Sequence, residues 1–215
     1  MNISILCSAS EHPIVQNLRA WIDSNSVLHV IQLVDDSSDL VGGDLLFLVS
    51  CSEVLTQEVM VKYGKTLVIH ASDLPVGRGW SPLVWQILAG QQEVVVTLLE
   101  AAEAVDAGDI WAQEVIQIPA TALHDEINGI LFKAELKLLD YAVVNMESVA
   151  PRPQDPNIKP TYFKKRTPAL SELDAFRPIA EQFDLIRVCD PERYPAFFFY
   201  RGQKFRLTVE KVNDE

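Results

Sequence analysis

The sequence predicts an α/β fold, with a Rossmann-like, mostly parallel sheet followed by a small C-terminal β appendage. Apolar runs typical of strands alternate with segments of helical apolar spacing over the first 150 residues, the pattern of a parallel sheet flanked by helices. The run at residues 45–50 is continuously apolar up to its final serine, as a strand covered on both faces requires. Three prolines at residues 149–156 mark a change of composition before the last part of the chain.

Each expected element follows from local spacing and boundary residues. Residues 13–24 place Ile14, Leu18, Trp21 and Ile22 at helical spacing. A serine and then a proline open residues 81–88, which is a typical helix start. Further helices are expected at residues 52–63 and 121–146, and a polar loop at residues 35–39. Strands are expected at residues 2–7, 28–34, 45–50, 65–70, 93–99 and 109–118.

The proline-rich stretch is expected to be a linker or extended surface segment. It divides the chain into a catalytic α/β domain, residues 1–150, and a C-terminal extension, residues 151–215. The extension is too short for a second full domain, so it is expected to pack on the main sheet. A helix is expected at residues 176–183, followed by segments at 184–188, 197–200 and 204–212. The last two flank Arg201 and Gly202, a hairpin signal, and this hairpin is a candidate homodimer contact.

Composition limits the possible partners and compartments. The net charge of −12 is unfavourable for nucleic-acid binding, because that affinity rests largely on Lys and Arg neutralising phosphates. The longest apolar runs are too short to span a membrane, and the first residues resemble a strand rather than a signal peptide. The three cysteines have neither metal-ligand spacing nor a disulfide framework. We therefore expect a cytoplasmic protein without metal, nucleic-acid or membrane partners.

A basic cluster at residues 159–166 stands out from this acidic background. It holds four Lys and Arg side chains. The cluster is either a solvated charge run or a small clamp for an anion such as a diphosphate.

The candidate chemistry centres on His70, which ends the strand-like run at residues 66–70. Histidine is well suited to proton transfer near neutral pH, and a carboxylate is the usual group that orients it. Asp106 lies in a second loop, and ligands of parallel sheets bind outside the carboxyl ends of the strands. From the residues alone, a structural histidine and a turn-forming aspartate are the favoured interpretations, and composition and spacing leave the pairing of the two open. Neither GxGxxG after the first strand nor GxxxxGK[ST] occurs, so nicotinamide and ATP binding are disfavoured.

Two longer motifs lie around these residues: one begins His70-Ala-Ser-Asp-Leu-Pro75, and the other ends Asp106-Ala-Gly-Asp-Ile-Trp-Ala-Gln113. Both resemble the 10-formyltetrahydrofolate-dependent formyltransferase family, whose members share the methionyl-tRNA formyltransferase fold. Residues 70–90 are similar to the family's His-Pro-Ser-x-Leu-Pro signature, its Gly/Arg loop and its proline-capped helix. Residues 96–113 are similar to the second motif, Asp-x-Gly-x-Ile-x-x-Gln. Residues 161–168 and 193–205 resemble the C-terminal segment of sugar-nucleotide N-formyltransferases. The resemblance covers residues 45–212 and is strongest to the short branch of the pseudaminic-acid pathway.

The resemblance implies formyl transfer from 10-formyltetrahydrofolate, as co-substrate, to the amine of a nucleotide-linked 4-amino-dideoxy sugar. Such a step would serve the biosynthesis of surface polysaccharides. It implies that His70 moves or stabilises protons and that Asp106 orients it. The cofactor contacts it implies are Ser50, Cys51, Ser52, Leu55, Ser72, Leu74, Pro75, Ala102, Ala104 and Val105. The substrate contacts we expect are Arg78, Trp80, Tyr162, Lys164 and Arg166.

One position departs from the family pattern. The family asparagine that donates to the oxyanion lies two residues before the histidine, and here that residue is Val68. Losing one such donor costs about 2.7–4 kcal/mol in enzymes where it has been tested. Three alternatives are open. Another donor (His70 itself, Ser72 or a backbone N–H) replaces the asparagine, or the enzyme is active but slow, or the chain is a relative that only binds folate or sugar nucleotide. A methionyl-tRNA acceptor is a further alternative, which the acidic charge and the short C-terminal part oppose.

Overall fold

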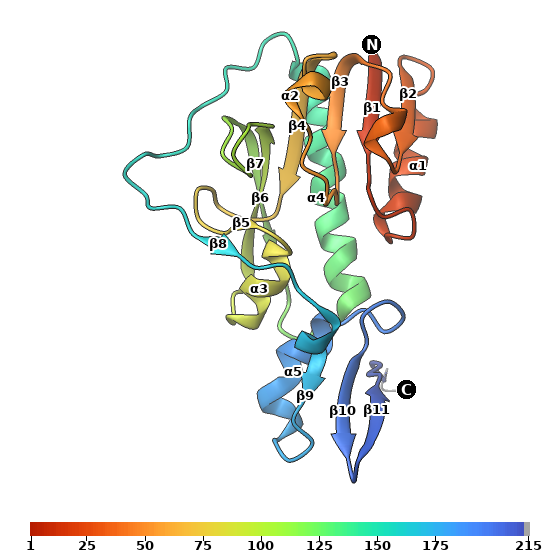
Figure 1. Ribbon diagram of the computed structural model, residues 1–215, viewed down its shortest axis with the longest axis vertical. Coiled ribbons are helices and arrows are strands. Elements are labelled where there is room, and N and C mark those ends of the chain that lie inside the picture. Colours follow the sequence, from red (N-terminus) through yellow and green to blue (C-terminus); the bar gives the residue numbers. More distant parts are fainter. Residues whose placement is uncertain (213–215) are drawn as a thin grey trace.

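The computed structural model describes residues 1–212 and is built around a six-stranded sheet of order β2-β1-β3-β4-β6-β7 (Figure 1). Strands β2, β1, β3 and β4 are parallel, and β6 is antiparallel to both of its neighbours. The mostly parallel α/β sheet that the sequence predicts is therefore confirmed. The six strands are β1 (Asn2–Leu6), β2 (Val30–Val34), β3 (Gly43–Leu48), β4 (Tyr63–His70), β6 (Glu93–Glu100) and β7 (Ile110–Gln117).

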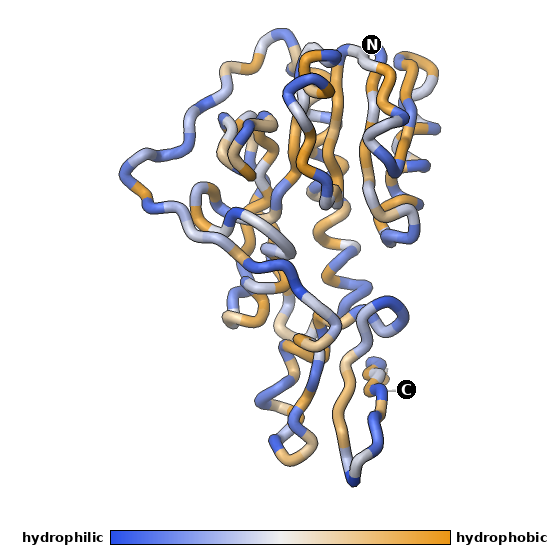
Figure 2. Tube along the Cα trace, in the orientation of Figure 1, coloured by the Kyte–Doolittle hydropathy of each residue, from blue (hydrophilic) through white to orange (hydrophobic). Residues whose placement is uncertain are grey.

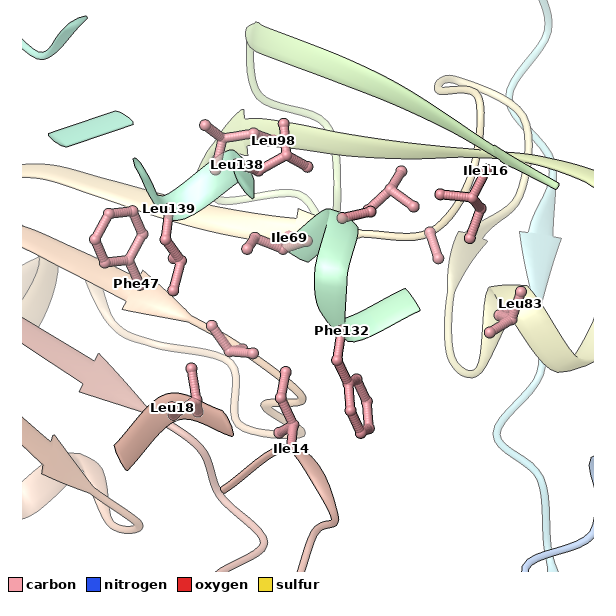
Figure 3. Packing of buried hydrophobic residues seen from close by; sticks show 14 of the residues in the cluster. Ile14, Leu18, Phe47, Ile69, Leu83, Leu98, Ile116, Phe132, Leu138 and Leu139 are labelled. Atoms are coloured by element: carbon pink, nitrogen blue, oxygen red, sulfur yellow. The ribbon is translucent and has the colours of Figure 1, made fainter. Parts of the chain in front are cut away.

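The main hydrophobic core lies between one face of this sheet and two helices, α1 (Ile14–Asn25) and α4 (His124–Asn145). Figure 3 shows Phe132 and Leu139 of α4 beside side chains from β3, β4 and α1. On β3, Leu45 and Phe47 join this core, whereas Leu46 and Leu48 join a smaller cluster on the other face. Both faces of β3 are thus buried, which explains its continuously apolar sequence.

The opposite face of the sheet has a lighter cover. Its cluster consists of Leu6, Leu40, Leu46, Leu48 and Tyr63, with the short helix α2 (Gln57–Met60) packed beside β4. Residues 51–56, before α2, have no regular secondary structure.

The chain after α4 follows the outside of the molecule before it forms a second small core. Residues 147–161 run as a mostly hydrophilic strap, tied to β7 by a bridge between Arg152 and Ile110 (Figures 1 and 2). Strand β8 (Tyr162–Phe163) then pairs with β5 (Arg78–Gly79), just before α3 (Pro82–Leu88). The remaining elements are the 3-10 turn Pro168–Ser171, β9 (Glu172–Leu173), α5 (Ile179–Val188), β10 (Ala196–Tyr200) and β11 (Gln203–Leu207).

The C-terminal hairpin has the geometry that its sequence predicts. Strands β10 and β11 pair antiparallel, and β9 adds to β10 in parallel. The turn residues Arg201 and Gly202 have φ of 49° and 79°, as the favoured two-residue hairpin turn requires. Leu173, Ile186, Cys189 and Ala196 form the core beneath it.

Some expected boundaries were wrong. The helix expected at residues 52–63 is reduced to Gln57–Met60, because Tyr63 is buried as the first residue of β4 and its hydroxyl donates to Ser4 Oγ at 2.9 Å. Ser81 has a left-handed backbone conformation, with φ of 52°, and its side chain makes no capping hydrogen bond. Of the two predicted start signals, only Pro82 at the first position of α3 is therefore present. Helix α5 begins after Pro178 and includes residues 184–188, which the sequence predicts as a separate segment. The loop at residues 35–39 contains a 3-10 turn at Ser37–Asp39.

Within residues 1–212 none of the helices is both long and apolar enough to cross a membrane.

Phe47, fully buried in the main core, is expected to be critical for stability. Phe47→Ala should lower the free energy of unfolding by about 3–5 kcal/mol, measured by urea denaturation, because it removes a large side chain from a packed interior. Val144→Ala is the control, since Val144 lies on α4 with 79% of its surface exposed. Similar losses for both variants would contradict this description of the core.

Candidate active site

His70 is held at the end of β4 by a bond to a backbone carbonyl. Its side chain is 6% exposed, and Nε2 lies 2.8 Å from the Gly77 carbonyl oxygen. A carbonyl oxygen can only accept, so Nε2 carries the hydrogen and donates it. The other ring nitrogen, Nδ1, lies 3.5 Å from Asp106 Oδ2. Nδ1 is therefore the nitrogen of His70 that is available to gain or lose a proton.

Asp106 reaches His70 because its loop turns back over the sheet. Asp106 has a φ of 52°, and its Oδ2 accepts a hydrogen bond of 2.8 Å from the Gly79 N–H. A Cβ on Gly108 would lie 1.9 Å from the Glu100 carbonyl oxygen, so only glycine allows the loop to pass so close to β6. The sequence pair His70 and Asp106 is thus brought together, with both side chains buried.

Gln154, in the strap, joins the two loops that carry this pair. Its Nε2 donates to the carbonyl oxygens of Asp106 and Gly108 at 2.8 and 3.0 Å. Its Oε1 accepts from Arg78 Nη2 at 2.6 Å. Sequence reasoning missed Gln154, because a glutamine among prolines carries no local sign of such a role.

The loop at residues 71–79 is fixed by the segment that contains β8. Thr161 accepts from the Gly77 N–H through its hydroxyl at 2.8 Å and from the Arg78 N–H through its carbonyl at 2.9 Å. A Cβ on Gly77 would lie 2.6 Å from the Phe163 ring, which explains the glycine. The carbonyl that orients His70 is therefore held by a segment over 80 residues further along the chain.

A cavity of about 550 Å³ opens at this point and contains both His70 and Asp106 in its wall. It passes the carboxyl edge of the sheet from one face to the other, because its lining includes Val68, of the smaller cluster, and Ile69, of the main core. Its size is typical of small-molecule sites. Predicted contact residues in its wall are Ser50, Cys51, Ser52, Leu55, Trp80, Ala102, Val105 and Arg166.

The other predicted contact residues lie outside the cavity wall. They are Ser72, Leu74, Pro75, Arg78, Ala104, Tyr162 and Lys164. Leu74 instead packs against Leu99 and Ile110, and Ser72 is buried with its carbonyl accepting from Thr97 Oγ1. Arg78 donates to Tyr162 Oη at 3.3 Å, so these two side chains bind each other.

Lys165 and Arg193 line the cavity together with Arg166, whereas Lys164 does not. The Lys164 carbonyl accepts from Trp85 Nε1 at 2.9 Å, and the Arg166 guanidinium lies 5.4 Å from the centre of the Trp85 ring. Trp85 thus holds the basic segment against α3. Arg166 makes no ion pair with any acidic residue among residues 1–212.

The part of the cavity against α4 has titratable groups that sequence reasoning missed. Burial raises the pKa of Glu135 to about 8, and burial together with Arg193 lowers the pKa of His12 to about 4. Burial also lowers the pKa of His124, whose Nε2 lies 3.8 Å from Asp190 Oδ2. At neutral pH this wall is therefore largely uncharged at Glu135 and His12. The residues lie far apart in sequence, so no motif could have indicated them.

The fold and the site together define a class of protein. It is an α/β protein with a histidine–aspartate pair in a cavity at the carboxyl edge of its sheet. The family model described as "Formyl transferase" matches residues 6–143, more than half of the chain. The chain therefore belongs to the formyl transferase family.

Individual relatives extend this comparison. The chain is 30% identical over 177 residues to a methionyl-tRNA formyltransferase of Sulfurihydrogenibium sp. (strain YO3AOP1), covering 79% of this chain and 55% of that protein. It thus spans about half the length of that curated relative.

Solved structures share the fold at lower identity. A methionyl-tRNA formyltransferase from Clostridium thermocellum has a TM-score of 0.83 at 21% identity, over 99% of this chain and 94% of that chain. HypX from Aquifex aeolicus, solved with tetrahydrofolic acid, has 0.79 at 23%, over 96% of this chain and 37% of that chain. A sugar N-formyltransferase from Shewanella sp. FDAARGOS_354 has 0.74 at 16%, over 100% of this chain and 99% of that chain.

Gly108→Ala should displace the Asp106 loop, because the new Cβ would overlap the Glu100 carbonyl. Without the bond from the Gly79 N–H to Asp106, amide exchange at Gly79 should be about tenfold faster or more, the effect of losing a charged hydrogen bond of about 1.5 kcal/mol. Gly129→Ala is the control, since a Cβ there meets nothing within 4 Å and should stabilise α4. Unchanged exchange at Gly79 in Gly108→Ala would contradict the proposed role of this glycine.

Proposed function

We propose that this protein is an N-formyltransferase that moves a formyl group from 10-formyltetrahydrofolate to the amine of a nucleotide-linked 4-amino-dideoxy sugar. The observation that carries the proposal is the buried pair of His70 and Asp106, placed where the cavity passes from one face of the sheet to the other. Two substrates can then approach the pair from opposite sides. Membership of the formyl transferase family supports the reaction class.

The face of the sheet covered by the loops at residues 50–55 and 101–106 fits the folate donor. Small side chains line it at Ser50, Cys51, Ser52, Ala101 and Ala102, and these leave backbone groups available to the flat pterin ring. Val68, Leu48 and Leu55 supply an apolar wall. The HypX structure with tetrahydrofolic acid, which has the same fold, supports a folate ligand. When bound, the donor supplies a formyl carbonyl as the electrophile.

His70 moves the proton in the proposed reaction. As the acceptor amine forms its bond to the formyl carbon, Nδ1 takes a proton from the amine nitrogen. Asp106, 3.5 Å from Nδ1, stabilises the imidazolium that results. Nδ1 then returns the proton to the folate nitrogen that leaves, so the reaction consumes no net proton. Nε2 stays bonded to Gly77 throughout and keeps the ring in place.

The side chain at residue 68 offers no hydrogen-bond donor to the oxyanion. Val68 lies on the same face of β4 as His70, two residues away, and lines the cavity. Ser72 is a poor replacement, because it is buried outside the cavity wall. We infer that His70, once protonated at Nδ1, is the donor that serves the oxyanion.

The acceptor is inferred from the charges around the cavity. Lys165, Arg166 and Arg193 provide cations for a diphosphate, and Trp80 provides an aromatic face for a base or a sugar. The sugar N-formyltransferase from Shewanella, with the same fold over nearly its whole chain, supports this acceptor class.

A methionyl-tRNA acceptor is the second candidate, favoured by the name of the 30% identical relative. The length of the chain does not count against it, since the chain covers 94% of the solved C. thermocellum chain. The net charge of −12 does oppose it. A non-catalytic binder is a third candidate, favoured by Val68.

His70→Ala should lower the rate of folate-dependent formylation by about a hundredfold or more, because it removes the proton carrier. The measurement is tetrahydrofolate release with 10-formyltetrahydrofolate and a panel of nucleotide-linked 4-amino-4,6-dideoxy sugars. His29→Ala, outside the cavity, is the control and should keep the full rate. A His70→Ala variant as fast as the control would rule out the proton-transfer role. If the protein formylated methionyl-tRNA but none of the sugars, the acceptor would be the tRNA and not a nucleotide-linked sugar.

Val68→Asn should raise kcat about tenfold or more, because it adds a side-chain donor on the face of β4 that carries His70. Val68→Ala adds no donor and serves as the matched control. Equal rates for Val68→Asn and the unchanged protein would mean that a missing donor does not limit the reaction. If Val68→Asn turned over substrate and the unchanged protein did not, the natural chain would be assigned as a non-catalytic binder.

A further inference from the structure

Glu135 is a carboxyl group buried in the α4 wall of the cavity without a structural partner. It is 6% exposed, and its Oε2 has no hydrogen-bond partner among residues 1–212. None of the ion pairs found in that range includes it. Burial raises its pKa to about 8, so at neutral pH most molecules carry the protonated, uncharged acid. A protonated carboxyl can donate one hydrogen bond, and here the fold gives it nothing to donate to.

Such a group costs free energy that an apolar residue would not. Its neighbours along α4 are Phe132, Ala134, Leu138 and Leu139, all buried in the main core. A leucine at position 135 would suit both the helix and this apolar surrounding. A sequence that keeps an unsatisfied polar group in its interior breaks a local rule of stability, which is most often seen at functional sites.

The position of Glu135 within the cavity indicates which ligand it faces. His124, Ile127, Asn128, Leu131 and Glu135 line the cavity from a single face of α4, at the helical spacing i, i+3, i+4, i+7 and i+11. Helix α4 covers the face of the sheet that carries Ile69, opposite to Val68 and the two proposed folate loops. If the donor occupies the loop side, the α4 side is the space left for the acceptor.

We propose that Glu135 is a specificity-determining residue that hydrogen-bonds a hydroxyl oxygen on the ring of the acceptor sugar. This inference rests on the proposed function. Ile127 and Leu131 offer apolar contact to the C–H face of a deoxy sugar, and Glu135 supplies a polar partner for a hydroxyl group of the ring. The cations at Lys165, Arg166 and Arg193 would bind the charged part of the same ligand. Glu135 therefore selects the ring, and the basic residues bind the nucleotide diphosphate.

The test compares three variants in the ligand-free state and in steady-state kinetics. Glu135→Leu removes the donor and the unsatisfied oxygen, so it should raise Tm. It should also raise KM for the nucleotide-linked 4-amino-4,6-dideoxy sugar about tenfold or more, with KM for 10-formyltetrahydrofolate unchanged. Glu135→Gln keeps the shape and a donor, and should stay within a fewfold of the original KM. Thr66→Val is the matched control, since Thr66 Oγ1 is also buried without a partner but lies outside the cavity. It should not lower Tm and should leave both KM values unchanged.

The outcomes separate this inference from the proposed function. A higher Tm with unchanged acceptor KM in Glu135→Leu would overturn the role of Glu135 while formylation stands. A lower Tm in Glu135→Leu, rescued by Glu135→Gln, would assign the carboxyl to the structure and also overturn it. No turnover of any sugar by the unchanged protein would reject the acceptor class, and the inference with it.

Discussion

The hydrogen bond from His70 Nε2 to the Gly77 carbonyl is the interaction on which the geometry of the site depends. It fixes the tautomer and the orientation of the ring, and it leaves Nδ1 toward Asp106. The Gly77 loop is held from the other side by Thr161, which accepts from the Gly77 N–H, and by the Phe163 ring packed against it. The orientation of His70, at the end of β4, thus depends on a segment that comes after all six strands of the sheet in the sequence.

This arrangement changes how the C-terminal part of the chain is understood. The division at residue 150 stays a prediction, but the contacts that hold the site cross it. Gln154 bridges Arg78 and the Asp106 loop, and Arg166 and Arg193 form part of the cavity wall. The segment predicted to be a linker therefore also holds the site together. Its polar side chains supply hydrogen bonds that the loops of the main sheet do not make with each other.

Much of the fold could be predicted because apolar periodicity reports burial, and burial determines the strands and the long helices. The pair His70 and Asp106 could be proposed from two motifs. Side-chain direction in irregular segments could not be predicted from the sequence. Lys165 lines the cavity whereas Lys164 does not, and Leu74 packs in a small core, so ligand contacts by Lys164 and Leu74 stay predictions. Glu135 could not be predicted for a different reason. In the sequence it is one acidic residue on a long helix, and only the fold shows that it is buried without a partner.

The valine at position 68 places two tasks on one nitrogen, and the order of the proposed steps makes them compatible. Before the attack, Nδ1 of His70 must be free to accept a proton from the amine. Afterwards it is the N–H of an imidazolium, and charged donors form stronger hydrogen bonds than neutral amides do. Asp106, 3.5 Å away, stabilises this charge, and the attraction is stronger than in water because both side chains are buried. In the proposed reaction the oxyanion donor is therefore created by the proton transfer itself, so an asparagine at position 68 would add early stabilisation without being essential to the chemistry.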